Sequence, residues 1–397
     1  MKKKLLLFLI FLSQPVTAWN SGDHRAIAYF GLQEVSTSWG LAKSVEVHPL
    51  KSLLTKLPMG VDSWRFSDWL RINPSINLEH LDPEAENKKS LTPLEILTLY
   101  STDPDDGRDQ DLFSRDEKGN PLALYPDQKW FGALDGANSQ AFRHLEKPPF
   151  SIKTPFSTFG FPFRAVGEAT RRAEIWFELS LLAFDLQEDY WGWRFLANSF
   201  HYLQDLHQPF HAGQVTPSLL CRGFGSYLVW GHEKKGMMGT IAHLISNLHR
   251  FYETYVQNPG GEDHGGKERA INSLIGTDLL PPPVSVRELA RQIRDDSNRD
   301  FPTLIAAITE IVDPKLLGPF VFTSDGPNPP NSMTAGEFLK KGPAFEATNR
   351  KIFAITQERF SSAGRTMRTV VRFSLDQRGR EKSAALIRKI DSLLTTD

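Results

Sequence analysis

Apolar residues recur at intervals of three and four along most of this chain of 397 residues. Such spacing places them on one face of a helix. It predicts helices at 23–35, 164–186, 191–206, 240–256, 284–295, 302–312, 351–373 and 381–394. Alternating strand patterns are sparse, and stretches rich in proline, glycine or aspartate separate the helices, at 99–128, 145–162, 258–267, 280–283 and 317–332. The sequence therefore predicts an all-α fold with long loop insertions.

The N-terminus has the pattern of a secretory signal peptide over residues 1–18. Three lysines precede an apolar run at 5–12, and Ala18 with a valine two residues earlier fits the rule for cleavage. The apolar run is too short to span a bilayer as a helix. Cleavage after Ala18 would make Trp19 the first residue of an exported protein, periplasmic or secreted, with no transmembrane anchor. The alternative is an uncleaved N-terminal anchor.

The rest of the chain is expected to form one large domain, residues 19–375, followed by a C-terminal helical tail at 376–397. A net charge of -1 provides no electrostatic reason to expect tight binding to a polyanion. Cys221 is the single cysteine, so no intramolecular disulfide can form. A large core and bound metals are the expected sources of stability.

The densest chemical signal in the sequence is the segment 201–213. His201 and Asp205 are four residues apart, which places both on one face of a helix. Pro209 is expected to end or kink that helix at about residue 208, so that His211 turns back from just beyond its end. Imidazole and carboxylate ligands suit zinc. The same spacing of four recurs in His249 and Glu253 within another helical stretch.

Two further elements carry ligands of the same kind. The mature N-terminus would offer the amino and carbonyl groups of Trp19, with His24 five residues later. Asp68 and His80 could converge across the loop between them, although Asp62 lies close to Asp68 and stays an alternative. Four such elements in one chain favour a metal centre over four separate surface pairs.

Other histidines and acids are interpreted as structural. His207 is expected to lie behind the ligands or at the surface. The remaining histidines without a partner at ligand spacing are expected in the surface, loops or core, namely His48, His144, His232, His243 and His264. The aspartate-rich run at 103–111 lacks the closing glutamate of a calcium-binding EF-hand loop, so a solvated loop is predicted there.

These motifs resemble those of the zinc-dependent phospholipase C and single-strand-specific zinc nuclease superfamily. The His-x3-Asp-x5-His pattern at 201–211 with Gln-Pro inside it carries the resemblance, as does a tryptophan at the cleavage site with a histidine five residues on. The fold implied is a compact multi-helix bundle. The resemblance also implies three zinc ions, the first held by Asp68, His80, His201 and Asp205, the second by His211, His249 and Glu253, and the third by Trp19, His24 and a bridging Asp205.

The activity implied is hydrolysis of phosphodiester bonds by a metal-bound hydroxide, with Asp68 also orienting the attacking water. Glu253 and the apolar insertion within 213–248 favour phospholipase C, with transient contact to a membrane surface. A single-strand-specific nuclease or 3'-nucleotidase is the first alternative, with Trp64 and Trp69 available to stack bases. A non-catalytic, zinc-stabilised binding protein is the second. The substrate would be a phospholipid or a nucleic acid, and no obligate protein partner is inferred.

Overall fold

A computed structural model describes residues 21–58, 84–85, 87–106, 143–153, 158–161, 165–230, 236–257, 266–312 and 343–395. Helices predominate in these ranges, which confirms the predicted all-α class. The α-helices are α1 (Ser21–Leu32), α2 (Leu50–Thr55), α4 (Pro93–Tyr100), α6 (Ala169–Asp185), α7 (Asp189–His207), α8 (Pro209–Ala212), α9 (Pro217–Trp230), α10 (Gly236–Gln257), α11 (Gly266–Leu274), α12 (Val286–Ile311), α14 (Pro343–Gln377) and α15 (Ser383–Thr395). The 3-10 helix η2 (Gln33–Val35) follows α1.

The described strands are short and form three antiparallel pairs. The first pair joins β1 (Val45–Glu46) to β2 (Ser90–Leu91), the second β3 (Glu146–Lys147) to β6 (Val166–Gly167), and the third β4 (Phe150–Lys153) to β5 (Thr158–Phe161). In the first pair Val45 lies opposite Leu91, and in the second Lys147 lies opposite Val166. These ribbons join the helices and do not form a layer of their own.

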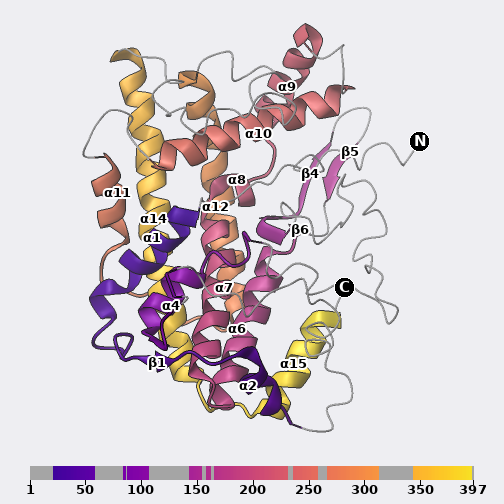
Figure 1. Cartoon of the computed structure of the whole chain (residues 1–397). Helices are drawn as coiled ribbons and strands as arrows, with labels where there is room; N and C mark the ends of the chain where they lie inside the picture. Colours follow the sequence, from indigo (N-terminus) through magenta and orange to yellow (C-terminus); the bar gives the residue numbers. More distant parts are fainter. Residues whose placement is uncertain are drawn as a thin grey trace.

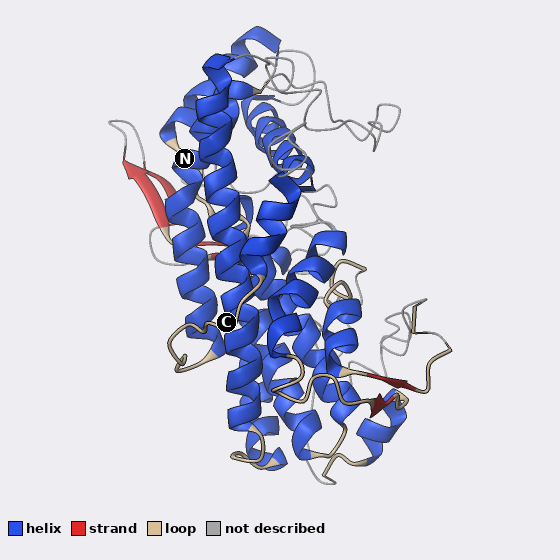
Figure 2. Ribbon diagram, turned by 90° about the vertical axis from the view of Figure 1, so that its left-hand side faces the viewer, coloured by secondary structure: helices blue, strands red, loops and turns tan. Residues whose placement is uncertain are grey.

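The core lies where α6 and α7 pack against each other, with α12 and α14 beside them (Figure 1). Long helices run side by side through the bundle when it is seen from the side (Figure 2). Almost every residue of α6 is buried, and a helix that is buried on nearly all faces belongs at the centre of a bundle. On the outside, α1 packs on α4 and α14, and α15 packs on α6.

Local sequence signals account for several helix ends. Ser285 caps α12 by accepting a hydrogen bond from the backbone nitrogen of Glu288. Thr92 and Glu95 form a capping box at the start of α4. The prediction of two helices at 284–295 and 302–312 is wrong, because α12 continues through Pro302. Buried residues on both sides of Pro302 keep this helix packed on the core, at the cost of one backbone hydrogen bond.

The close approach of α1 to α14 depends on two glycines. A Cβ atom on Gly31 would lie 3.4 Å from the Cα atom of Gly364, and one on Gly364 would lie only 2.3 Å from the carbonyl oxygen of Leu274. Arg368 of α14 fixes this junction by donating to the carbonyl oxygens of Gly31 at 3.0 Å and Leu274 at 2.8 Å. The junction positions α1, which carries His24.

The helix at the C-terminal end of the chain, α15, is more closely packed on the bundle than a separate tail would be. The predicted tail at 376–397 contains the end of α14 and α15, and the apolar face of α15 is buried: Leu386, Ile387, Ile390, Leu393 and Leu394. α15 is thus part of the packed bundle. The proposed signal peptide lies outside the described residues. Among the residues that are described, no helix is both long enough and apolar enough to cross a membrane.

Candidate metal centre

The centre is built on α7, which presents His201 and Asp205 one turn apart on a fully buried face. Nε2 of His201 lies 3.3 Å from Oδ2 of Asp205. α7 ends at His207 and Gln208 is extended, so the chain turns at the position that Pro209 predicts. The short helix α8 then carries His211.

His24 reaches the centre from α1. Its ring stacks on that of His201 with 4.1 Å between the centroids. Its Nδ1 donates to Oε1 of Gln204 at 2.5 Å, which leaves Nε2 directed at the carboxylates. Nε2 lies 3.5 Å from Oδ1 of Asp205 and 3.7 Å from Oδ2 of Asp105.

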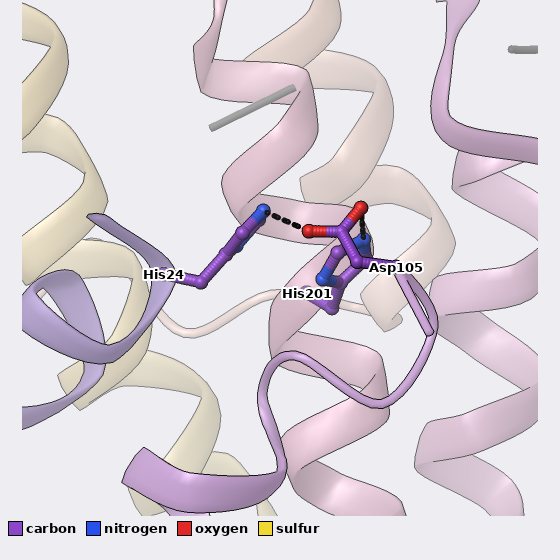
Figure 3. A group of neighbouring side chains, drawn as sticks. All are labelled: His24, Asp105 and His201. Carbon is purple, nitrogen blue, oxygen red and sulfur yellow. Dashed lines mark ion pairs between the residues drawn. The ribbon is translucent and has the colours of Figure 1, made fainter. Parts of the chain in front are cut away.

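Asp105 comes from the turn that follows α4, residues 101–106. Figure 3 shows its carboxylate facing a ring nitrogen of His24 and one of His201, and Oδ1 lies 3.8 Å from Nε2 of His201. The same turn provides the carbonyl oxygen of Ser101, which accepts a hydrogen bond of 2.8 Å from Nδ1 of His201. A histidine held in this way at Nδ1 presents Nε2 as a metal ligand.

His144 completes the group from the segment that leads into β3. Its Nδ1 lies 2.9 Å from Oδ2 of Asp205, 2.8 Å from Nε2 of His201 and 3.7 Å from Oδ1 of Asp105. Two sets of potential ligands result, each with ligand atoms within 4.8 Å of one another: His24, Asp105 and His201, and His144, His201 and Asp205. Either set could hold a metal ion.

His211, His249 and Glu253 form a neighbouring group. The rings of His211 and His249 lie 4.9 Å apart, and Nε2 of His249 lies 3.2 Å from Oε1 of Glu253, one turn along α10. Nδ1 of His211 donates to the carbonyl oxygen of His144 at 2.6 Å, which ties this group to the first. The three residues are thus brought together, as the resemblance implies.

Burial controls the protonation of the imidazoles. It lowers the pKa of His24, His144 and His249 well below the ordinary value, and neighbouring histidines add to the effect. Burial also lowers the pKa of His211, to about 3. These rings are therefore neutral at physiological pH, the form that binds metals.

Two groups of the centre, His201 and Glu253, instead have pKa values above their ordinary ones. Burial lowers the pKa of His201, but the charges of Asp205 and Asp105 outweigh burial and raise it to about 9. Burial raises the pKa of Glu253 well above the ordinary value, and nearby carboxylates raise it further. The crowded carboxylates favour a positive charge between them, which a proton on His201 supplies and a metal cation could replace.

The hydrogen bonding of the centre also fits metal binding. At the centre, the buried atoms that have no hydrogen-bond partner among the described residues include Nε2 of His24, His144, His211 and His249, and Oε1 of Glu253. Buried polar atoms are normally satisfied, so a cluster of exceptions calls for an explanation. Imidazole nitrogens and carboxylate oxygens are zinc ligands, so a zinc ion would satisfy them.

Three of the predicted site residues, Trp19, Asp68 and His80, lie outside the described residues, as does Asp62. Beside His201 and Asp205, where the resemblance implies Asp68 and His80, the structure has Asp105 and His144. His144 has no partner at ligand spacing and is interpreted from the sequence as a structural histidine, but its buried side chain contacts both residues of α7. No local spacing reveals this, because its partners are distant in sequence.

One further interpretation needs correction, and another is narrowed. The predicted solvated loop at 103–111 is wrong for Asp103 and Asp105, whose side chains are only 2% and 3% exposed. Both face α7, where Asp103 pairs with Arg194 and Asp105 lies near His201. For His207 the surface is excluded and a position behind the ligands remains, since its side chain is buried and its Nε2 lies 3.0 Å from Oγ1 of Thr366.

A scan against models of known protein families found no match to this chain, and neither did a search of curated proteins.

Proposed function

We propose that this protein is a zinc-dependent phosphodiesterase whose substrates are phospholipids. The observation that carries the metal dependence is the convergence of histidines and carboxylates from distant segments, with ring nitrogens that lack hydrogen-bond partners among the described residues. The motifs shared with the zinc phospholipase C and nuclease superfamily support phosphodiesters as the substrate class. Fold class alone carries no such argument.

The residues divide into two ligand groups around Asp205. His24, Asp105, His144 and His201 surround this carboxylate, and His211, His249 and Glu253 form the neighbouring group. Oδ1 of Asp205 faces His24 and Oδ2 faces His144, so Asp205 can serve two cations at once. A third cation held by the amino group of Trp19 stays a prediction.

Bound zinc would supply Lewis acidity, which activates water and neutralises charge on the phosphoryl oxygens. The protein's own contribution is to hold the ligands in place before substrate arrives. His24, His201 and His211 each donate Nδ1–H to an oxygen, which fixes the direction of Nε2. Burial excludes water around them and strengthens electrostatic interactions.

The surface of α9 favours lipid over nucleic acid. Phe224 and Leu228 lie four residues apart on this helix and are 48% and 64% exposed, and Cys221 is exposed one turn earlier. Large apolar side chains exposed on one face of a helix favour contact with a lipid surface. α9 begins shortly after His211 and packs on α10, which carries His249 and Glu253. Lipid contact would therefore be made by the helix that lies in the chain between His211 and the helix carrying His249 and Glu253.

The test uses the mature protein, stripped by a strong chelator and reloaded with zinc, on phosphatidylcholine vesicles, a soluble phosphodiester and single-stranded DNA. We expect zinc to restore hydrolysis of the vesicles and of the soluble ester. Hydrolysis of the DNA alone would replace the lipid substrate by a nucleic acid. Zinc binding without turnover of any of the three would favour a non-catalytic binding protein.

The contact with lipid is tested separately with Phe224→Ser and Leu228→Ser. We expect these variants to lose hydrolysis of vesicles and to keep that of the soluble ester. Ser218→Ala, at an exposed position of the same helix, is the control. Equal loss on both substrates would mean that α9 acts through the fold and does not contact lipid.

A further inference from the structure

The turn at residues 101–106, here called the Asp105 turn, contacts His201 in two places. The carbonyl oxygen of Ser101 accepts from Nδ1 of His201, and the carboxylate of Asp105 lies near its Nε2. Short backbone hydrogen bonds hold the turn internally, from Asp103 to Tyr100 at 3.2 Å and from Asp105 to Thr102 at 3.0 Å. These bonds do not determine where the turn lies relative to α7.

Arg194 of α7 anchors the turn midway between these two contacts. Its Nε donates to Oδ2 of Asp103 at 3.0 Å, and both side chains are buried, at 1% and 2% exposed. Nη1 lies 3.2 Å from the hydroxyl oxygen of Tyr190, and the guanidinium carbon lies 4.0 Å from the ring centroid of Tyr100. Tyr100 is the last residue of α4, directly before the turn. The guanidinium is therefore held on several sides.

The location of Arg194 on α7 matters for the metal centre. It precedes His201 by two helical turns, a distance of about 10 Å along a rigid axis. α7 thus carries two of the proposed ligands, His201 and Asp205. It also carries Arg194, which binds the turn that contains Asp105. On the other side, Arg143, next to His144, donates to the carbonyl oxygen of Pro104 at 3.5 Å. The turn is held from both flanks by residues adjoining the centre.

We propose that Arg194 and Asp103 are a positioning pair that places the carboxylate of Asp105 and the carbonyl oxygen of Ser101 against His201. The inference rests on the proposed metal centre. Arg194 and Asp103 do not themselves bind the metal; they determine the geometry of a ligand and of the hydrogen bond that orients another. Partners of this kind typically contribute 10- to 100-fold to metal affinity.

The pair is tested with Asp103→Asn, Arg194→Lys and the double variant, each measured for zinc affinity by chelator competition. We expect each single variant to weaken zinc binding by about 10- to 100-fold. The double variant should lose little more than either single one, because both act through the same contact. The visible spectrum of the cobalt-loaded protein should also change, since it reports the geometry of the ligands.

Glu178→Gln provides a matched control. Glu178 of α6 is buried and pairs with Lys389 of α15 at 2.7 Å, so its replacement also breaks an internal ion pair but leaves the Asp105 turn untouched. We expect a lower melting temperature with unchanged zinc affinity and cobalt spectrum. Circular dichroism at the assay temperature verifies that every variant is folded.

Folded Asp103→Asn and Arg194→Lys proteins that bind zinc as tightly as the parent protein would overturn the inference. A loss of zinc affinity in Glu178→Gln equal to that in these two variants would also overturn it. These outcomes do not depend on turnover. A parent protein that binds zinc but hydrolyses no phosphodiester would refute the proposed function and leave the positioning pair intact.

Discussion

At the scale of single residues, the centre depends on which histidine nitrogen faces inward. His201 donates Nδ1–H to Ser101 and His211 donates Nδ1–H to His144, so in both the backbone sets the ring orientation. The sequence identifies these histidines by their spacing from Asp205. It contains no sign of the carbonyl acceptors, which lie 100 and 67 residues away in the chain.

The clearest prediction at this scale separates His144 from His80. His144→Ala should lower zinc affinity by more than the roughly 10- to 100-fold typical of an indirect partner, because His144 adjoins both Asp205 and His201. His80 lies outside the described residues and stays a predicted ligand, so His80→Ala is measured beside it. Chelator competition on both folded variants compares the two losses. A loss of zinc affinity in His80→Ala alone would favour His80 over His144 as the ligand beside His201 and Asp205.

A second residue-scale prediction concerns His48, away from the centre. Its hydrogen bond to Glu188, at 2.9 Å, is the main cause that raises the pKa of His48 above its ordinary 6.5. Burial raises the pKa of Glu188, but hydrogen bonds from Lys56, Ser52 and His48 outweigh burial and lower it, so the carboxylate stays ionised near neutrality. The pair of protonated His48 and ionised Glu188 stabilises the folded state. This stabilisation is complete below pH 6.5 and is lost as the pH rises through the folded-state pKa of His48.

The effect is small because the side chain of His48 is 37% exposed, and a pair of this kind contributes about 0.2–1 kcal/mol. Urea unfolding of the parent and His48→Gln at about pH 5.5 and about pH 8.5 measures it. The difference in unfolding free energy should shrink at the higher pH. A difference that is equal at both pH values would show that His48 contributes by packing.

At the scale of elements, helix packing converts sequence spacing into a site. α7 holds His201 and Asp205 on one face, and the sequence predicts this directly from a spacing of four. The docking of α1 on α14 brings His24 to that face. It depends on the close approach of Gly31 to Gly364 and on Arg368 of α14, which donates hydrogen bonds to carbonyl oxygens of α1 and α11. No spacing within α1 predicts this contact.

Gly364→Ala tests the neighbouring contact of α14 with α11, which ends at Leu274. A methyl group there would lie 2.3 Å from the carbonyl oxygen of Leu274, so the helices must separate. We expect a loss of about 1–3 kcal/mol in the free energy of unfolding, as for other overpacked sites. Gly225→Ala of α9 is the control, because nothing lies within 4 Å of its added methyl group, and helix propensity favours alanine there. Similar losses in both variants would refute a specific close contact between α11 and α14.

At the scale of the whole molecule, the candidate metal centre is a junction between parts of the fold. Its potential ligands come from α1, the Asp105 turn, the approach to β3, α7, α8 and α10. Bringing carboxylates and unsatisfied imidazoles together without a cation costs free energy. The fold and the metal should therefore stabilise each other.

Removal of metal should lower the melting temperature, and zinc should restore it. The stabilisation grows with the logarithm of free zinc and reaches about 4 kcal/mol at a thousandfold excess over the dissociation constant. Thermal unfolding followed by circular dichroism at several zinc concentrations measures this. Identical curves for stripped and loaded protein would contradict a metal centre at this junction.

Deletion of residues 382–397 tests whether α15 belongs to the bundle. The deletion removes the buried apolar face of α15, the ion pair of Lys389 with Glu178, and the hydrogen bond from Arg171 to the carbonyl oxygen of Leu393. We expect a marked loss of unfolding free energy, with zinc affinity preserved at low temperature because α6 and α15 contribute no ligand. A truncated protein that melts as the parent does would make α15 a peripheral addition.

The amino-acid pattern was sufficient for the helical class, for the turn at Pro209 and for the ligand pairs within α7 and α10, because helical periodicity and proline geometry act over a few residues. Long-range packing was needed to select Asp105 and His144, since the aspartate run around Asp105 and the surroundings of His144 carry no spacing that distinguishes a ligand. Their selection follows from where the Asp105 turn and the approach to β3 meet α7. That meeting depends on contacts such as the one between Arg194 and Asp103, whose partners lie 91 residues apart.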